Sequence, residues 1–129
     1  MILRVDDLMI KGEDNSAVKS DATLKDVIVE LSKKGLGIVS VVDEFDRLLG
    51  VVTDGDIRRQ LERGADIYSF NAIDVMSRNP VTIQSGKFAV EALSIMKEKN
   101  KVSALPVIAN NQIVGTVRLH EIIEAGIVG

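Results

Sequence analysis

The sequence contains no cysteine and no tryptophan, and its single histidine is His120. Without cysteine it has no disulfide framework, no thiolate nucleophile and no thiolate metal site. A lone histidine, with no Ser or Cys nucleophile paired with it and no second ligand beside it, does not make a catalytic or metal centre. These absences exclude several classes of enzyme and lead us to expect a cytoplasmic location.

Aromatic residues and excess positive charge are also scarce. The chain has three Phe, one Tyr and a net charge of −3. A nucleic-acid partner needs a basic field for its phosphates and aromatic faces for unpaired bases, so we expect no nucleic acid. The apolar runs are far shorter than the roughly 20 residues of a membrane-spanning helix, and the N-terminus lacks the pattern of a signal peptide. We therefore expect no membrane partner.

The sequence does contain an internal repeat. The stretch from Gly50 to Arg59 returns 65 residues later from Gly115. An apolar helix face repeats at the same distance: Leu24, Val27, Ile28 and Leu31 correspond to Ala89, Ala92, Leu93 and Met96. Each copy is typical of a strand, a helix, two strands and a second helix. With 46% apolar and 27% charged residues, the composition is that of an ordinary globular protein.

Capping signals, periodicity and turn residues place the elements along the chain. A short helix or turn is expected around residues 6–9, with a short amphipathic turn at 73–76. The longer helices are expected at 23–35, at 54–62, over the face 89–96 with Ser85 as its candidate cap, and at 121–125. Strands are expected near Val18 and at 38–42, 48–52, 104–108 and 113–117.

Neither copy, at about sixty residues, has enough elements to bury its apolar helix face alone. We therefore expect an α/β (α+β) fold in which two strand-helix-strand-strand-helix repeats pack about a pseudo-two-fold axis. Clefts between such repeats commonly hold ligands. The expected boundaries are 9–64 for the first repeat, 65–80 for a linker and 81–129 for the second repeat.

The candidate site of the first copy begins with Thr53 and Asp56, which have the spacing of a helix capping box. The same groups suit a ligand, because free N–H groups at a helix start bind anions while a hydroxyl and a carboxylate suit a ribose phosphate. Asp54 adds a second carboxylate, which complements the helix dipole and falls short of a Ca²⁺ site. Arg59 is either a solvated helix residue or a contact to an anionic ligand.

The second copy departs from the first, because Arg118 replaces Thr53 and Glu121 replaces Asp56. The planar fork of Arg118 suits a phosphate or a sugar-acid carboxylate, and the alternative is an exposed arginine at the end of a strand. His120 is either a surface or capping residue or part of the cleft lining. One intact site and one altered site are expected.

The motif Gly-Val-Val-Thr-Asp-Gly-Asp after paired strands, repeated at Gly115, resembles a tandem pair of cystathionine-β-synthase-type (CBS) domains. The similarity covers the chain from about Met9 onward. In such pairs the Thr contacts phosphate and the Asp takes the ribose hydroxyls, roles that the resemblance assigns to Thr53 and Asp56. The resemblance also makes Ser103, before the second strand pair, a polar contact to a base.

A narrower resemblance adds four stretches, namely 53–59, 72–76, 89–93 and 119–128. They are similar to the C-terminal CBS pair of D-arabinose 5-phosphate isomerases, which supply the precursor of the octulosonate (Kdo) of lipopolysaccharide. In that family a sugar isomerase domain precedes the pair, and these 129 residues do not contain it. The resemblance implies a homodimeric regulatory module without catalysis or a required cofactor. Its effector would be a nucleotide or nucleotide-sugar such as AMP, ATP or CMP-Kdo.

Three alternatives remain open at the level of the sequence. The first is a freestanding CBS protein that senses AMP or ATP and acts on a separate partner. The second is the regulatory pair of a sugar-phosphate nucleotidyltransferase, since the stretch from Thr53 to Arg59 is also similar to CBS pairs of those enzymes. The third is a purely structural pair that holds subunits together with empty clefts.

Overall fold

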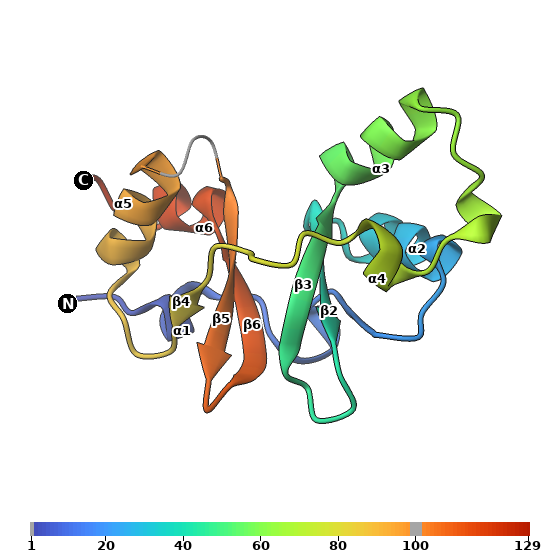
Figure 1. The fold of residues 1–129 in the computed structure, drawn as a ribbon. Coiled ribbons are helices and arrows are strands. Elements are labelled where there is room, and N and C mark those ends of the chain that lie inside the picture. The colour runs from blue at the N-terminus through green and yellow to red at the C-terminus, as the bar shows by residue number, and fades with distance from the viewer. Residues whose placement is uncertain (1, 99–101) are drawn as a thin grey trace. The chain divides into compact units, whose positions relative to one another are not determined.

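The computed structural model describes residues 2–98 and 102–129, and the chain forms two compact units. Unit 1 combines the N-terminal residues up to Asn15 with Val81–Gly129, and unit 2 is Ser16–Pro80. Each unit contains a three-stranded sheet and several helices, so the expected mixed α/β fold is confirmed (Figure 1). The folded units are cut differently from the sequence repeats proposed at 9–64 and 81–129.

Unit 2 contains the first repeat. Its sheet has the order β1-β2-β3, with β1 parallel to β2 and β2 antiparallel to β3. A capping box at Thr23 begins α2, and Gly35 in the left-handed conformation (φ 69°) ends it, as its sequence signals indicate. The elements of unit 2 are β1 (Ala17–Lys19), α2 (Leu24–Lys34), β2 (Ile38–Val42), β3 (Leu48–Thr53), α3 (Asp54–Glu62), the 3₁₀ turn η2 (Ile67–Ser69) and α4 (Ala72–Val75).

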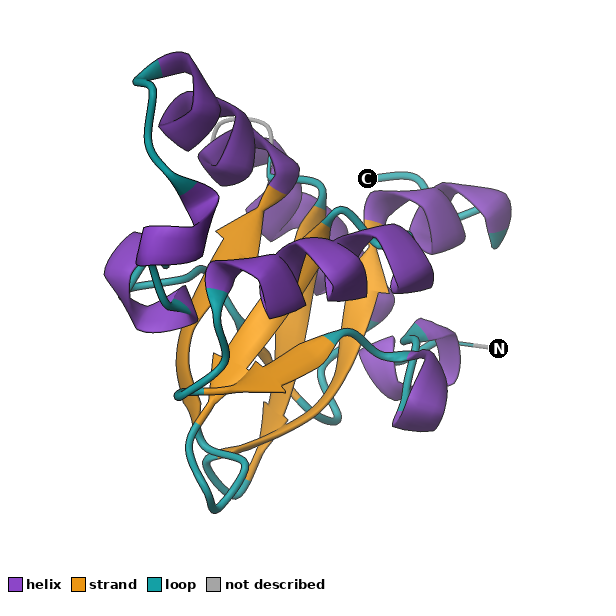
Figure 2. Cartoon of the chain, turned by 90° about the vertical axis from the view of Figure 1, so that its right-hand side faces the viewer, coloured by secondary structure: helices purple, strands orange, loops and turns teal. Residues whose placement is uncertain are grey.

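Unit 1 contains the second repeat, with the sheet order β4-β5-β6 and the same strand directions. Asn110 and Asn111, both with positive φ, make the expected turn between β5 and β6. Helices flank the strands in both units (Figure 2). The elements of unit 1 are α1 (Val5–Leu8), the 3₁₀ turn η1 (Gly12–Asp14), β4 (Ile83–Gln84), α5 (Ala89–Glu98), β5 (Ala104–Ala109), β6 (Gln112–Arg118) and α6 (Leu119–Glu124). Among the described residues no helix is long and apolar enough to cross a membrane.

The expectation that Ser85 caps the helix of the second repeat is wrong. Phe88 immediately precedes α5, and its N–H donates to Glu91 Oε2 at 2.8 Å. The hydroxyl of Ser85 instead donates to the carboxylate of Asp6. The reason is that Thr23, the cap of the equivalent helix, corresponds to Phe88 in the second copy, which leaves the serine three residues too early.

The N-terminal residues 2–10, which we call the strap, are part of unit 1. Val5 is completely buried in the apolar core of this unit. The Ala89 N–H donates to the Leu3 carbonyl at 2.9 Å, which fixes one end of the strap at the start of α5. At the other end Ile10 and Thr116 exchange both backbone hydrogen bonds, at 2.8 and 2.9 Å, and pair the strap with β6.

Residues 70–77 have the same relation to unit 2 as the strap has to unit 1. The Leu24 N–H donates to the Phe70 carbonyl at 2.9 Å, and Val51 and Ser77 exchange backbone bonds at 3.0 and 2.8 Å. The segment expected as a linker is therefore a second copy of the strap. The sequence carries the signal, since 5–9 reads Val-Asp-Asp-Leu-Met and 72–76 reads Ala-Ile-Asp-Val-Met, but its short length hid the repeat from the pattern analysis.

Asp6 fastens the strap to the turn after β4. Its carboxylate accepts hydrogen bonds from the Ser85 hydroxyl and from the Gly86 N–H, the latter at 2.6 Å. The hydrogen bond from Ser85 is the main cause that lowers the pKa of Asp6 below its ordinary value, and partial burial opposes it. The charged form of Asp6 is therefore the form that holds the strap.

We predict that Asp6→Asn removes part of the acid sensitivity of the fold. A carboxylate with a lowered folded-state pKa stabilises the fold above its unfolded-state pKa of about 3.9, and this contribution is lost as the pH falls through the lower value. In urea titrations, the free energy of unfolding of the wild type should fall more steeply below about pH 4 than that of Asp6→Asn. Asp21→Asn, a change at an exposed carboxylate of unit 2, should keep the wild-type slope. Equal slopes for all three proteins would refute this role of Asp6.

Candidate functional site

In unit 2, β3 runs directly into α3, and this junction positions Thr53 and Asp56 (Figure 1). The Asp56 N–H donates to Thr53 Oγ1 at 3.2 Å, and the Thr53 N–H donates to Asp56 Oδ2 at 2.9 Å. The capping box predicted from the spacing is confirmed. The box satisfies only part of the helix start, and the N–H of Gly55, between Asp54 and Asp56, remains for an anion.

Arg59 occupies the remaining oxygen of the Asp56 carboxylate. Its guanidinium donates to Asp56 Oδ1 from one turn further along α3. The Asp56 side chain is 16% exposed and the Arg59 side chain is 54% exposed. Ion pairs with an exposed partner contribute little to stability, so a ligand hydroxyl can replace Arg59 on this oxygen at low cost.

Two arginines turn back over the first turn of α3. A Cβ atom placed on Gly55 would lie 3.4 Å from Arg59 Nη1 and 3.8 Å from Arg58 Nη2. Both guanidinium groups therefore lie beside the positive end of the helix dipole. An anion at this position would be attracted by the dipole and by both charges.

Asp54 has a different environment from Thr53 and Asp56. Its N–H donates to the Gly37 carbonyl at 3.3 Å, and its side chain lines a cavity of about 300 Å³ between α2 and α3. Asp54 therefore belongs to the groove between these helices and does not complete the set made by Thr53, Asp56 and Arg59. No group of three His, Cys, Asp or Glu residues in the part of the chain that the structure describes is arranged to hold a metal.

In unit 1 the equivalent junction between β6 and α6 holds an internal ion pair. Arg118 Nε donates to Glu121 Oε1 at 2.8 Å, and Arg118 Nη2 donates to Glu121 Oε2 at 2.6 Å. The two side chains are only 26% and 18% exposed. The hydrogen bonds to Glu121 raise the pKa of Arg118 above its ordinary value, against the opposing effect of burial. The fork expected to meet a ligand is thus already occupied by a carboxylate of the same chain.

Ser103 and His120 bond to residues other than Arg118 and Glu121. Ser103 is exposed at the edge of a cavity of about 490 Å³ lined by α5 and α6, and its carbonyl accepts the Leu119 N–H at 2.8 Å. His120 Nε2 lies 2.9 Å from Glu124 Oε2, and both of these side chains are about 70% exposed. Their roles as ligand contacts stay predictions.

The sequence analysis missed the role of Glu121 as the partner of Arg118. The signal was present, because a cation and a carboxylate three residues apart on a helix face one another. It was read only as a substitution of Asp56. The spacing of these two residues, and not their match to the first copy, decides what the second site contains.

Comparison with known proteins agrees with this architecture. The CBS domain family matches residues 5–63 and 72–127. The chain is 34% identical over 128 residues to arabinose 5-phosphate isomerase KdsD of Yersinia pestis and 38% identical over 128 residues to that of Pseudomonas aeruginosa. These alignments cover 99% and 98% of the chain but 39% of each relative, so the chain spans about two fifths of their length.

Solved structures with the same fold include CBSX2 in complex with AMP and hypoxic response protein I with two coordinated zinc ions. CBSX2 has a TM-score of 0.81 and 22% identity, with 96% of both chains covered. Hypoxic response protein I has a TM-score of 0.81 and 24% identity, with 94% of this chain and 97% of that chain covered. Because both identities are below 25%, these likenesses establish the fold alone. The two stretches matched by the family model show that the chain belongs to the CBS domain family and carries the domain twice.

Proposed function

We propose that this chain is the regulatory CBS pair of an arabinose 5-phosphate isomerase and binds a nucleotide or nucleotide-sugar effector. Identities of 32–38% to KdsD proteins over nearly the whole chain support the parent enzyme. The observation that carries the ligand class is the start of α3, where Thr53 and Asp56 lie beside two arginines. CBSX2, which has the same fold, was solved in complex with AMP.

In this proposal the first repeat supplies the nucleotide site. The phosphate lies over Gly55, where the Gly55 N–H donates to it and the two guanidinium groups neutralise its charge. The ribose hydroxyls donate to Asp56 after Arg59 moves from the carboxylate to the phosphate. Arg59 therefore exchanges one anionic partner for another, and the Asp56 carboxylate keeps hydrogen bonds from the Thr53 N–H and from the ribose hydroxyls.

The second repeat supplies a site in which a ligand has to displace a stronger internal ion pair. A ligand can use the Arg118 fork only by displacing Glu121, which binds it through two hydrogen bonds. A neutral ribose cannot compete with a bidentate carboxylate, but a second carboxylate or a phosphate can. CMP-Kdo, a sugar-acid nucleotide, has both groups, so feedback by this product of the Kdo pathway is the effector that we favour.

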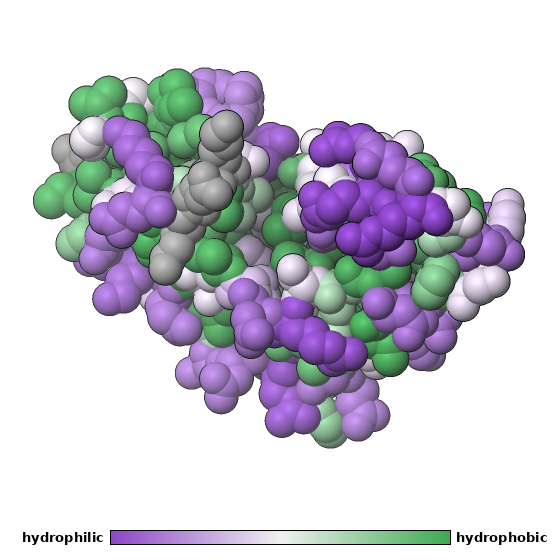
Figure 3. Space-filling view, turned by 45° about the horizontal axis from the view of Figure 1, so that its top comes forward, coloured by the Kyte–Doolittle hydropathy of each residue, from purple (hydrophilic) through white to green (hydrophobic). Residues whose placement is uncertain are grey.

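We also propose that the module is a homodimer formed through helix faces. Large apolar side chains are exposed on α2 and α3, where Val29 and Leu61 are each 55% exposed, and on α5 and α6, where Val90 is 44% and Ile123 is 60% exposed. Hydrophobic residues of unit 1 reach the surface next to hydrophilic ones (Figure 3). Each of these faces also contains an apolar cavity that a second copy can fill.

The effector regulates the enzyme, in this proposal, through its different affinities for two states of the assembly. The sugar isomerase domain is the partner within the parent chain, and no catalytic step is assigned to these 129 residues. A nucleotide effector and a sugar-phosphate enzyme are both consistent with the cytoplasmic location that we expected.

We predict that the purified chain is stabilised by a nucleotide. Thermal unfolding would be followed with AMP, ATP, CMP and CMP-Kdo at about 1 mM. An effector with submillimolar affinity should raise the melting temperature by about 3–8 °C, because it binds only the folded state. CMP-Kdo should have the largest effect, and Asp56→Asn should reduce the shift by removing the charge that accepts the ribose hydroxyls.

Two matched variants make this experiment specific. Arg118→Lys keeps the positive charge but loses the planar fork, so it should lose the advantage of CMP-Kdo over CMP. Glu44→Gln, at an exposed carboxylate in the turn between β2 and β3, should behave as the wild type. A preference for AMP or ATP that Arg118→Lys leaves unchanged would indicate an adenylate sensor instead. No shift with any of the four compounds would indicate a structural pair.

We predict that sedimentation equilibrium gives twice the mass of the chain, and that Ile123→Glu gives the mass of one chain. The charge would be buried against the apolar face of the partner, where it has no counter-charge. Tyr68→Glu changes a side chain that is 77% exposed outside the four helices and should leave the dimer intact. A dimer that survives Ile123→Glu would show that α6 is not in the interface.

A further inference from the structure

We propose that the strap, residues 2–10, transmits the state of the Arg118–Glu121 pair to the part of the protein that precedes it in the chain. This inference rests on the proposed function, in which a ligand opens that pair and an enzyme domain precedes the module. It adds the route by which ligand binding reaches the preceding domain, and it assigns this signal to the second repeat.

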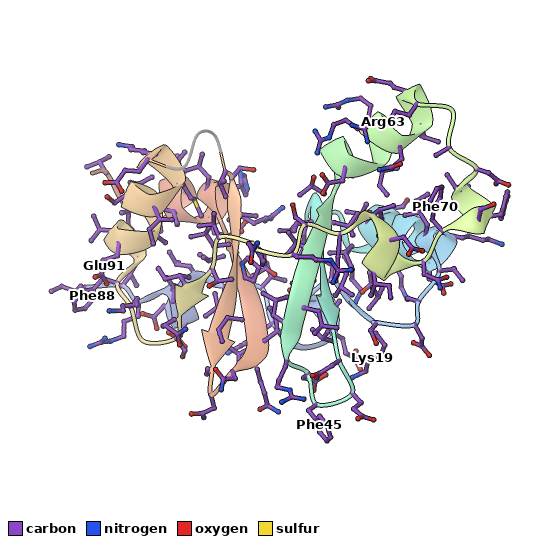
Figure 4. The ribbon with its side chains drawn as sticks, in the orientation of Figure 1. Lys19, Phe45, Arg63, Phe70, Phe88 and Glu91 are labelled. Atoms are coloured by element: carbon purple, nitrogen blue, oxygen red, sulfur yellow. The ribbon has the colours of Figure 1, made fainter. Side chains whose placement is uncertain are left out.

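The strap is held to unit 1 by charge, stacking and burial. The Arg4 guanidinium donates to the Gly86 carbonyl and lies over the ring of Phe88, 4.8 Å from the centroid. Phe88 and Glu91 mark this docking point at the start of α5 (Figure 4). Val5 is inserted into the core of the same unit. The strap therefore has a defined docked state, and its release would be a discrete local unfolding.

The end of the strap is bonded to the strand that leads into the ion pair. Ile10 pairs with Thr116, which lies two residues before Arg118, a distance of about 7 Å along a strand. Thr116 is 1% exposed, and its hydroxyl donates to Asn15 Oδ1 at 2.6 Å. In this proposal a movement of Arg118 away from Glu121 shifts the end of β6, and the shift reaches Ile10 through its backbone bonds with Thr116. The next residue, Leu119, is held separately by the bond from its N–H to the Ser103 carbonyl.

At Gly115 the strap and β6 are so close that their contact leaves no room for a displacement. A Cβ atom at Gly115 would lie 2.7 Å from the Ile10 carbonyl oxygen and 2.7 Å from Met9 Sδ. The strap is thus packed directly against the backbone of β6 at Gly115, where the Ile10 carbonyl and the Met9 side chain fill the space that a Cβ atom would take. Small changes in β6 are passed to the strap for the same reason.

The two repeats differ in where such a signal goes. In unit 2 the equivalent contact joins Val51 to Ser77, which lies in the internal segment 70–77. A change at the Thr53–Asp56 site therefore reaches a segment whose two ends both stay within this module. The strap instead leads towards whatever precedes residue 2, so the second repeat is the one connected to the preceding domain.

The first test needs no ligand. Amide hydrogen exchange of the full chain would be measured by NMR for the wild type, Arg118→Ala and Arg59→Ala. These variants break the ion pairs of Glu121 in unit 1 and of Asp56, the corresponding carboxylate, in unit 2. We expect Arg118→Ala to speed exchange at Val5 and Ile10 by about three- to tenfold, while Arg59→Ala leaves both unchanged. Val107, in the centre of the sheet of unit 1, reports global unfolding and should not change.

The outcomes of this test separate the alternatives. Unchanged exchange at Ile10 in Arg118→Ala overturns the proposal, and so does an equal increase in Arg59→Ala. An increase at Val107 as large as that at Ile10 would mean that the variant only destabilises the unit. Glu121→Gln, which keeps the size of the side chain and removes its charge, must then give the local effect for the proposal to stand.

The second test uses the reciprocity of coupling. Gly115→Ala forces the strap away from β6. If CMP-Kdo releases the strap, this variant must bind CMP-Kdo more tightly than the wild type does, and if CMP-Kdo tightens the docked strap, the variant must bind it more weakly. Binding of CMP-Kdo to the wild type without any change at Val5 and Ile10 would overturn the strap proposal alone. No binding of AMP, ATP, CMP or CMP-Kdo would overturn the proposed function, and the Arg118→Ala exchange data would still decide the role of the strap.

Discussion

The structure depends on a close backbone approach at two glycines. A Cβ atom on Gly50 would lie 2.5 Å from the Ser77 carbonyl oxygen, and one on Gly115 would lie 2.7 Å from that of Ile10. At both places a short segment from elsewhere in the chain pairs with the open edge of a three-stranded sheet. Without these segments β3 and β6 would be unprotected edge strands and the helix-lined cores would lose part of their cover.

The two repeats present the same backbone geometry with different chemistry. In the first, a threonine and an aspartate cap α3, and the arginine on the aspartate is half exposed and easily displaced. In the second, Arg118 and Glu121 form a bidentate pair with little exposure, which raises the pKa of Arg118. Exposed ion pairs are weak and ion pairs with two hydrogen bonds are strong. We therefore propose that a ligand opens the pair of the first repeat more easily than the pair of the second.

The segments that close the two units differ in where they lead along the chain. The segment 70–77 closes unit 2 and is internal, whereas the strap closes unit 1 and lies at the N-terminal end of the chain. In our proposal the relatives' greater length lies beyond that end, where a sugar isomerase domain would be attached. Regulation is then a competition between effector and Glu121 for Arg118, read out by the strap.

The sequence alone determined the longer helices, the two antiparallel strand pairs, the capping boxes at Thr23 and Thr53 and the resemblance to CBS pairs, because these follow from local spacing and from a 65-residue repeat. It did not determine which repeat receives residues 2–10, since the backbone bonds between Ile10 and Thr116 join positions far apart in the sequence. Nor did it reveal that Glu121 occupies the Arg118 fork. Those features depend on tertiary packing, where non-local contacts and side-chain geometry select among partners that local patterns permit equally.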